Sequence, residues 1–406
     1  MIFSVSWRNV WRNKTRSLVI ITAISLGIFA GVYTLAFMFG WIDQRVDAVI
    51  NTEVSHIQIH HPRYLESNEV SYFIPGIDTI RQNILEKDDV KAVTARVIVN
   101  CMIASAETGS GIKLTGVDPS NEMQVTNIHE HIVDGAYFEG VSNNPIVIGE
   151  KLAGKLNVKV RSRVVITLAE MDGTLTGGAF RVAGIYHTSN TGYDEMNAFV
   201  IDRDLKDLLE INDNAGHQLA VLLDENIMTD PVTEDLRSEY PELQVMTWTQ
   251  LLPEMQLLNE NMNLMMYIFV GIILLALGFG IVNTMLMVIL ERVKELGMLM
   301  AVGMNRVRIF GMIILESVFL SLTGGAVGIV LALILTAVTA RTGVDLSLWA
   351  EGLHSVGYAS VVYPRIGLDS VIAVTILVII TGILSAVYPA RKAVRLNPAE
   401  ALRIDM

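Results

Sequence analysis

Four long apolar runs limit what this chain can fold into. Three of them, 18–41, 264–290 and 370–388, contain no charged side chain, and the fourth, 309–340, contains only Glu316. About 20 apolar residues in a helix cross the hydrocarbon core of a bilayer. Helices in the core of a soluble protein rarely stay uncharged over such lengths. We therefore predict a membrane protein with four transmembrane α-helices.

Composition supports this class and excludes one kind of partner. Of the 406 residues, 51% are hydrophobic and 18% are charged, whereas soluble domains carry about 25% charged residues. The formal net charge of −12 argues against nucleic acid, because a phosphate-binding surface needs an excess of basic residues. Cys101 is the single cysteine, so an intrachain disulfide is excluded and the compartment is left open.

The first apolar run also resembles a secretory signal peptide, because basic residues precede it. It is much longer than the apolar region of such peptides, and no cleavage site of small residues follows it. We interpret it as a retained membrane anchor.

The distribution of Lys and Arg predicts the orientation of the spans. The segments 1–17, 291–308 and 389–406 each carry four of these residues, together 12 of the 30 in the chain. With four spans these segments share one side of the membrane, and short basic segments favour the cytoplasmic side. We expect cytoplasmic termini, a periplasmic domain at 42–263 and a periplasmic loop at 341–369.

The segment 1–17 has the pattern of an amphipathic helix. Phe3, Trp7 and Trp11 recur every four residues on one face. Basic residues recur with the same spacing on another face: Arg8, Arg12 and Arg16. Such a helix can lie at the level of the lipid headgroups. A frayed basic leader is the alternative.

The segment 42–263 predicts a mixed α/β domain. Its strand-like stretches are His56–His60, Val93–Val99, Pro145–Ile148, Val164–Leu168, Phe180–Ile185 and Gln218–Leu223. Its helix-like stretches are Thr79–Leu85, Lys151–Leu156, Asp204–Leu209 and Val232–Tyr240. Turns are expected at 108–111 and 172–178. A polar helical pattern at 249–263 continues directly into the second span.

Small residues recur at a spacing of four within the spans, as expected where helices pack closely. The pairs are Gly27 and Gly31, Ala276 and Gly280, Gly324 and Gly328, and Gly382 and Ala386. Glu316 is the only acid inside a span, and a buried charge there is usually paired or functional. Pairing with a basic residue near the cytoplasmic end and a proton relay both stay open.

Signals for enzymatic chemistry are weak. Gly149–Leu156 fits a phosphate-binding loop except that Leu156 stands where Mg²⁺ needs a hydroxyl, so we reject a nucleotide site. His56, His60 and His61, like His129 and His131, lack further ligands at a zinc spacing, and we expect them to be solvated. We predict no catalytic residues and no metal site on this chain.

The segment 291–308 is predicted to be a short cytoplasmic helix between two spans. Gly303 suits the position just after a helix end, and Val293, Leu296 and Met300 form an apolar stripe. Such a helix can insert into a cleft of a partner protein. A plain amphipathic connector fits the pattern equally well.

Two cytoplasmic motifs resemble the FtsX/MacB/LolC–LolE family of ABC transporter permeases. They are Glu291-Arg-x-x-Glu-Leu-Gly-x-Leu-x-Ala-Val-Gly303 and Tyr388-Pro-Ala-Arg-Lys-Ala-x-x-Leu-Asn-Pro398-Ala-Glu-Ala-Leu-Arg403. Glu316, the glycines 324, 325 and 328, and the segments 116–119 and 148–153 are also similar to the family. Arg161-Ser162 departs from it, because members often have Gly-Asp there.

The resemblance implies a large mixed α/β extracytoplasmic domain of the MacB periplasmic core type between spans 1 and 2. It further implies a type VII, mechanotransmission machine: a dimer of permeases, identical or paralogous, with two copies of a separate ABC ATPase that binds ATP and Mg. This chain itself would carry no cofactor. The residues expected to couple it to the ATPase are Glu291, Arg292, Glu295, Leu296, Gly297, Met300, Ala301 and Gly303.

The leading functional hypothesis is release of lipoproteins, or similar amphiphiles, from a bacterial inner membrane toward a periplasmic carrier. Only 17 residues precede the first span, which favours an ATPase on a separate subunit over the fused arrangement of MacB. The alternatives are drug or peptide efflux and an FtsX-like scaffold that activates a periplasmic hydrolase. Residues at the outer ends of spans 1 and 2 are a positional guess for cargo contact, with lipid-facing packing as the alternative: Met38, Trp41, Met262 and Met266.

Overall fold

The computed structural model describes residues 2–12, 14–67, 69–170 and 173–395. The chain divides into two compact units. We call Met1–Ile42, Asn259–Val344 and Val362–Met406 the helical unit, and Asp43–Leu258 with Asp345–Val361 the sheet unit. Each is described by itself.

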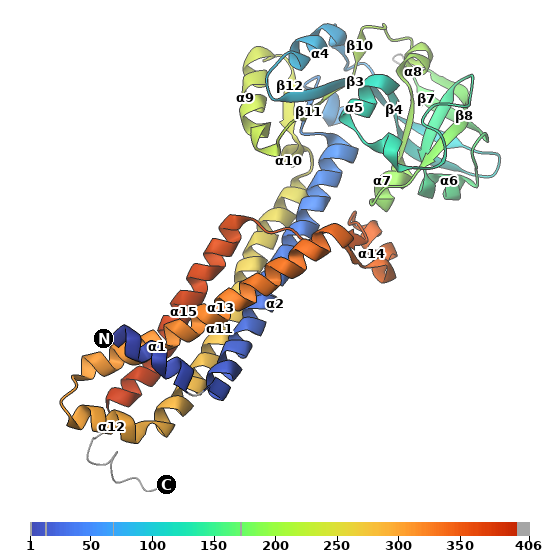
Figure 1. The fold of residues 1–406 in the computed structure, drawn as a ribbon. Coiled ribbons are helices and arrows are strands. Elements are labelled where there is room, and N and C mark those ends of the chain that lie inside the picture. Colours follow the sequence, from blue (N-terminus) through green and yellow to red (C-terminus); the bar gives the residue numbers. More distant parts are fainter. Residues whose placement is uncertain (1, 13, 68, 171–172, 396–406) are drawn as a thin grey trace. The chain divides into compact units, whose positions relative to one another are not determined.

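The helical unit is built from long helices and two short ones (Figure 1). They are α1 (Ile2–Arg12), α2 (Lys14–Ala48), α11 (Pro253–Glu291), α12 (Val293–Ala301), α13 (Arg306–Thr342) and α15 (Leu368–Val394). Residues 43–48 of α2 and 253–258 of α11 belong to the sheet unit. Four stretches are long and apolar enough to cross a membrane: Ser17–Val54, Leu264–Glu291, Arg306–Thr342 and Leu368–Val394. The prediction of four transmembrane helices is confirmed.

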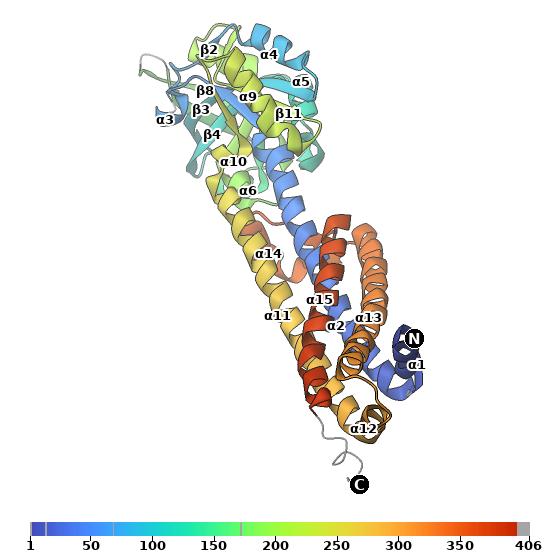
Figure 2. The ribbon, with the colours of Figure 1, turned by 90° about the vertical axis from the view of Figure 1, so that its left-hand side faces the viewer.

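Small residues let these helices approach closely. The Ser25 hydroxyl of α2 donates to the Gly324 carbonyl of α13 at 2.9 Å, and a Cβ on Gly328 would lie 2.6 Å from the Ser25 carbonyl oxygen. On α15, the Gly382 carbonyl accepts from Ser317 of α13 at 3.1 Å, and Figure 2 shows α13 and α15 side by side. Two of the predicted small-residue faces therefore pack between helices, as expected.

One predicted face behaves differently. Ala276 and Gly280 of α11 are exposed, and no atom lies within 4 Å of where a Cβ on Gly280 would stand. Along the same helix Tyr267, Phe279 and Leu275 are also exposed. These exposed side chains of α11 are available to contact lipid or another protein.

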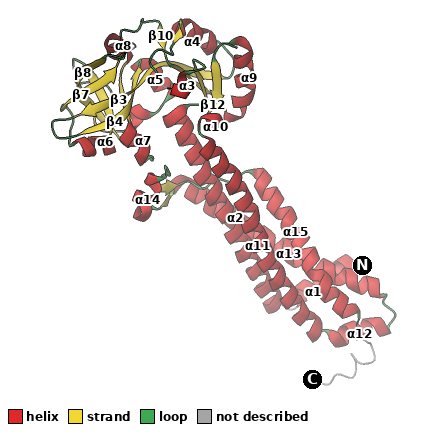
Figure 3. Ribbon diagram, turned by 180° about the vertical axis from the view of Figure 1, so that it is seen from behind, coloured by secondary structure: helices red, strands yellow, loops and turns green. Residues whose placement is uncertain are grey.

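The sheet unit contains a ten-stranded mixed sheet among the described residues (Figure 3). The order is β12 (Gln244–Thr247), β1 (Ile57–His60), β11 (Gln218–Leu223), β3 (Val90–Ala104), β4 (Gly109–Val117), β9 (Asn197–Ile201), β6 (Pro145–Gly149), β8 (Leu175–Tyr186) and β5 (Ile132–Gly135). Strand β7 (Arg163–Ala169) pairs with both β3 and β8. The β4–β9 and β6–β8 pairs are parallel, and the others are antiparallel.

Shorter elements complete both units. The helices are α3 (Tyr64–Ser67), α4 (Ile77–Leu85), α5 (Pro119–Val125), α6 (Glu150–Leu156), α7 (Thr191–Met196), α8 (Asp202–Leu209), α9 (Thr229–Glu239), α10 (Trp248–Leu251) and α14 (Ala350–Ser355). A π-helical turn spans Val49–Val54, and 3₁₀ turns span Ile128–His131, Asn226–Met228 and Ser347–Trp349. The short strands are β2 (Ile74–Pro75), β10 (Ala215–Gly216), β13 (Val344–Asp345) and β14 (Val361–Val362).

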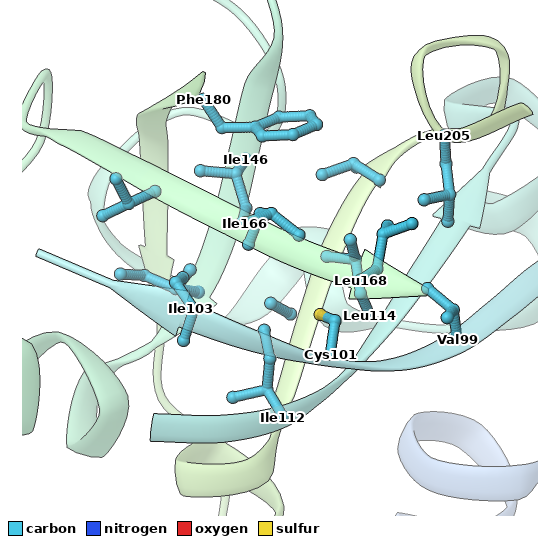
Figure 4. Close-up of a cluster of buried hydrophobic side chains, with 14 of the residues drawn as sticks. Val99, Cys101, Ile103, Ile112, Leu114, Ile146, Ile166, Leu168, Phe180 and Leu205 are labelled. Atoms are coloured by element: carbon cyan, nitrogen blue, oxygen red, sulfur yellow. The ribbon is translucent and has the colours of Figure 1, made fainter. Parts of the chain in front are cut away.

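The main core of the sheet unit forms where strands alternate between buried and exposed side chains. In β7 the side chains of Val164, Ile166 and Leu168 are buried while their neighbours face outward. Figure 4 shows Ile166 and Leu168 within a cluster that also holds Phe180 and Cys101. Burial raises the pKa of the Cys101 thiol to about 12, so this cysteine behaves as an apolar core residue.

All six predicted strands and all four predicted helices of the segment 42–263 are present, each within a few residues of the expected bounds. The turn expected at 172–178 is wrong beyond residue 174, because β8 begins at Leu175. A Cβ on Gly177 would lie 2.8 Å from the Ile166 carbonyl oxygen. The glycine thus marks close contact between neighbouring strands rather than a turn.

The expectation of solvated histidines is wrong for His56 and His60, which are both buried. The Nδ1 atom of His56 accepts from the Leu223 backbone at 3.1 Å, and both ring nitrogens of His60 have partners within 3.2 Å. Burial lowers the pKa of each imidazole to about 4. These two are neutral core residues at physiological pH.

The glycine of the rejected phosphate-loop match has a packing role. A Cβ on Gly149 would lie 2.0 Å from the Asp194 carbonyl oxygen. The residue is therefore small because β6 passes the backbone of α7 closely, and no phosphate is needed to explain it.

Candidate functional site

The segment between α11 and α13 forms a short helix with defined ends. Arg292, at φ −105° and ψ 18°, interrupts the helix after Glu291, and α12 begins at Val293. At the other end Gly303 adopts φ +98°. The Met304 N–H donates to the Leu299 carbonyl at 2.9 Å, and the Gly303 N–H donates to Met300 at 3.1 Å. This is the Schellman hydrogen-bond pattern, so the predicted role of Gly303 just past the helix end is confirmed.

The inner face of α12 packs against its own unit. Val293, Leu296 and Gly297 are buried, and Leu296 belongs to a hydrophobic cluster with Ile289 of α11 and Ile309 of α13. The predicted apolar stripe is therefore present. It faces the helical unit and is not available for a partner.

A ladder of charged side chains ties α12 to its neighbours. Arg12 of α1 donates to both carboxylate oxygens of Glu295 at 2.6 Å, and Arg292 Nε donates to the same group at 2.9 Å. The Arg292 Nη1 atom lies 3.2 Å from one oxygen and 3.3 Å from the other oxygen of Glu316 on α13. We call Arg12, Glu295, Arg292 and Glu316 the charge ladder.

Exposure decreases along the charge ladder. The side chains of Arg12 and Glu295 are 56% and 46% exposed, whereas those of Arg292 and Glu316 are 14% and 7% exposed. Hydrogen bonds from Arg12, and then from Arg292, lower the pKa of the Glu295 carboxyl below its usual value. Glu316 pairs with Arg292 and thereby answers the pairing question left open by its position in the sequence.

The outer face of α12 is apolar and exposed. Met298 and Val302 lie one helical turn apart, and Val307 follows at the start of α13; Val302 is 83% exposed. Lys294, Arg306 and Arg308 are exposed nearby in the sequence. We call Met298, Val302 and Val307 the outer face. Large apolar side chains that are exposed beside basic residues are candidates for contact with another protein.

The predicted coupling residues thus fall into four groups. Leu296 and Gly297 are buried, Arg292 and Glu295 belong to the charge ladder, and Met300 is half-buried. The exposed ones are Glu291, Ala301 and Gly303. Sequence reasoning missed the outer face because it took Val293, Leu296 and Met300 as the apolar stripe of the helix and did not consider Met298 and Val302.

Arg12 was also missed as a site residue. It lies 283 positions from Glu295, and no local pattern joins them. The basic spacing on α1 was the only signal for it, and that spacing predicted a lipid contact instead.

The four positions guessed for cargo do not converge. Met266 is buried and lines a cavity of about 270 Å³ with Leu35, Phe39 and Asp369 of the helical unit. Met38 and Trp41 are half-buried and do not line this cavity. The side chain of Met262 lies outside the described residues, as does the closing motif from position 396 onward.

Comparison with known proteins assigns both parts of the chain. Residues 17–239 match the model of the MacB-like periplasmic core domain, and residues 267–398 match that of the FtsX-like permease C-terminal domain. Together these models cover nearly the whole sequence.

The curated relatives include full-length matches and partial ones. An uncharacterised ABC transporter permease of Methanocaldococcus jannaschii is 25% identical, over 99% of this chain and 97% of that protein. The lipoprotein-releasing system transmembrane protein LolC of Neisseria meningitidis serogroup B is 21% identical, over 96% of this chain and 94% of that protein. The macrolide export ATP-binding/permease protein MacB of Rhodopirellula baltica is 33% identical over 34% of this chain, which is 18% of that protein.

Proposed function

Because this chain belongs to the family of ABC transporter permeases with a MacB-like periplasmic core and an FtsX-like C-terminal domain, we propose that it releases lipoproteins or similar amphiphiles from a bacterial inner membrane. The family membership and the four spans make it a multi-pass membrane protein and a permease subunit, not an enzyme. Its energy source is an ABC ATPase partner, since some relatives carry ATP-binding domains in the same chain.

One observation supports lipoproteins as the cargo. The LolC relative and this chain cover one another almost end to end, whereas the MacB relative matches only 141 residues. LolC is described as part of a lipoprotein-releasing system. In this proposal the sheet unit lies on the periplasmic side, the termini are cytoplasmic, and cargo passes to a soluble periplasmic carrier.

The geometry of α12 supports a route for the coupling force. The outer face offers apolar side chains to an ATPase, while the inner face and the charge ladder join α12 to α1, α11 and α13. A push on Met298 and Val302 would be transmitted to three helices of the unit, because α12 contacts all of them. In this proposal two ATPase copies bind ATP and Mg and act on a dimer of permeases.

The first experiment is affinity purification of the chain from its native membrane, with mass spectrometry of what is retained. The recovered ATPase is then reconstituted with the chain in liposomes that carry a triacylated lipoprotein, and ATP-dependent release to a soluble acceptor is measured. We expect release by the unaltered protein and loss of release in Val302→Asp. Ile227→Asp in the sheet unit, at a similarly exposed position, is the matched control and should behave like the unaltered protein.

Other outcomes would replace this proposal. Export of a macrolide or peptide without lipoprotein release would favour efflux, in line with the partial match to MacB. Retention of an ATPase with a cell-wall hydrolase, and no released cargo, would favour a signalling scaffold.

A further inference from the structure

A polar pocket of about 310 Å³ lies within the helical unit, and its walls come from α1, α2, α11 and α13. Six polar side chains line it: Asn9, Arg12, Ser17, Glu291, Arg292 and Glu316. Figure 2 shows α1 lying against α13. Three of these residues belong to the charge ladder. The other three, Asn9, Ser17 and Glu291, add an amide, a hydroxyl and a carboxylate.

The charges of the pocket are balanced and of both signs. Two guanidinium groups and two carboxylates give a formal net charge of zero. Arg292 and Glu316 are nearly buried, so a ligand that reaches them meets charge in a setting that weakens water's screening. A ligand with a single charge would be attracted by the two groups of opposite sign and repelled by the two of like sign. A zwitterion can place each of its charges beside groups of opposite sign.

The remaining wall of the pocket is apolar. Ile20, Val288 and Leu320 contribute to it, from α2, α11 and α13. Ser17 and Glu316 both belong to stretches that are long and apolar enough to cross a membrane, and Glu316 lies about three turns from the start of α13. The pocket therefore sits toward one end of the spans, where polar headgroups meet acyl chains.

We propose that this pocket binds a zwitterionic phospholipid with a primary amine, such as phosphatidylethanolamine. The phosphate contacts the guanidinium groups of Arg12 and Arg292 and the amide of Asn9. The ammonium group donates to the carboxylates of Glu291 and Glu316. The first carbons of the acyl chains lie along the apolar wall. A lipid bound there touches three members of the charge ladder, so bilayer composition would influence how firmly α12 is held.

The test measures lipid retention by the full-length chain with native mass spectrometry. The purified protein is exchanged into nanodiscs that contain equal parts of phosphatidylethanolamine, phosphatidylcholine and phosphatidylglycerol. We expect phosphatidylethanolamine to be retained about tenfold over phosphatidylcholine, because the trimethylated amine donates no hydrogen bond to a carboxylate. Phosphatidylglycerol, which has no amine, should also be retained less.

Single substitutions test which residues cause the preference for phosphatidylethanolamine. Arg12→Gln should abolish the preference, while Arg8→Gln, which removes an exposed arginine of the same helix outside the pocket, should preserve it. Glu295→Gln breaks the ion pair of Arg12 without altering the lining and should also preserve it. Asn9→Asp places a carboxylate beside the phosphate and should abolish the preference although all four residues of the charge ladder are kept.

Two results would overturn the proposal. Equal retention of the three lipids would mean that the pocket does not distinguish between their headgroups. Displacement of the lipid by soluble phosphoethanolamine at comparable concentration would mean that the ligand is a free phosphate compound and that the apolar wall contributes nothing.

Discussion

The two units use the same kind of ion pair in different surroundings. In the sheet unit, Arg96 on β3 donates to both oxygens of Glu122 on α5, at 2.7 and 3.1 Å, and the two side chains are 7% and 1% exposed. In the helical unit, one nitrogen of Arg12, Nη2, donates to both oxygens of Glu295 at 2.6 Å, and this pair is about half exposed. Both arginines contact both carboxylate oxygens of their partners, but the exposure of the two pairs to water differs.

This difference has a mechanical meaning. Removing one partner of a buried ion pair is costly because the remaining charge is not hydrated. An exposed ion pair contributes little to stability, since water can take the place of either partner. The sheet unit should therefore hold one arrangement, and the exposed end of the charge ladder can open and close at small cost. The proposed transmission of force through α12 would use both properties, an ion pair that opens easily and a domain that keeps its shape.

The strongest test of the comparison removes the buried acid. Glu122→Ala leaves Arg96 charged and buried without its partner, so we expect the sheet unit to lose about 3–5 kcal/mol of stability. Hydrogen exchange of the β3 and β11 amides in the full chain measures this loss. Glu122→Gln, which keeps one acceptor, should lose less, and an unchanged exchange rate in both variants would contradict the comparison.

The second test uses pH. The pKa of His56 is about 4 in the folded protein and 6.5 when unfolded, because burial and then the nearby Lys91 disfavour the charged ring. Between these values His56 binds more protons in the unfolded state, so this residue lowers the free energy of unfolding by about 3 kcal/mol as pH drops from 6.5 to 4. His60, whose pKa in the folded protein is also about 4, adds to the fall.

Thermal unfolding of the sheet unit across this pH range measures the effect. In His56→Asn the side-chain oxygen can still accept from Leu223, but it does not titrate, so the curve should be flatter. An equal slope in the variant would show that other groups cause the acid sensitivity.

The third test moves to the end of α12. Gly303→Ala should cost about 1–3 kcal/mol, because a side chain disfavours φ near +98°. No atom lies within 4 Å of the added Cβ, so backbone strain is the only source of the loss. Gly303→Pro should be worse and lower ATP-linked release while membrane insertion stays intact. Release at the normal rate in both variants would rule out α12 as the coupling element.

The smallest expected change in stability is at the exposed pair. Glu295→Gln should cost less than about 1 kcal/mol, in contrast with the loss at Glu122. Charge reversal in Glu295→Arg repels Arg12 and Arg292 and should lower ATPase-linked release, measured in the reconstituted system. Normal release in this variant would mean that the charge ladder has no part in coupling.

Sequence reasoning predicted what depends on local pattern. Long runs of apolar residues predicted the four spans, and short stretches of strand-forming residues predicted strands such as β7. Gly303 predicted the end of α12, because few other residues adopt its backbone conformation. Each of these signals lies within a few residues of the structure that it specifies.

Features that depend on distant contacts were missed. The pairing of Arg12 with Glu295, the burial of His56 and the close approach at Gly149 arise from elements far apart in the chain. The outer face of α12 was missed for another reason, since the sequence pattern does not show which apolar residues of the helix pack against its own unit. The roles of the coupling and cargo residues remain predictions.

The burial of Cys101 makes the protein convenient to label. Its thiol is enclosed in the core of the sheet unit and scarcely ionised at neutral pH, so maleimide reagents should leave the native chain unmodified. A cysteine introduced at Val302, or at an exposed position such as Ile227, would then be the sole reactive site without any background substitution. Paired spin or fluorescent probes at such positions would report distance changes during ATP turnover in otherwise wild-type protein.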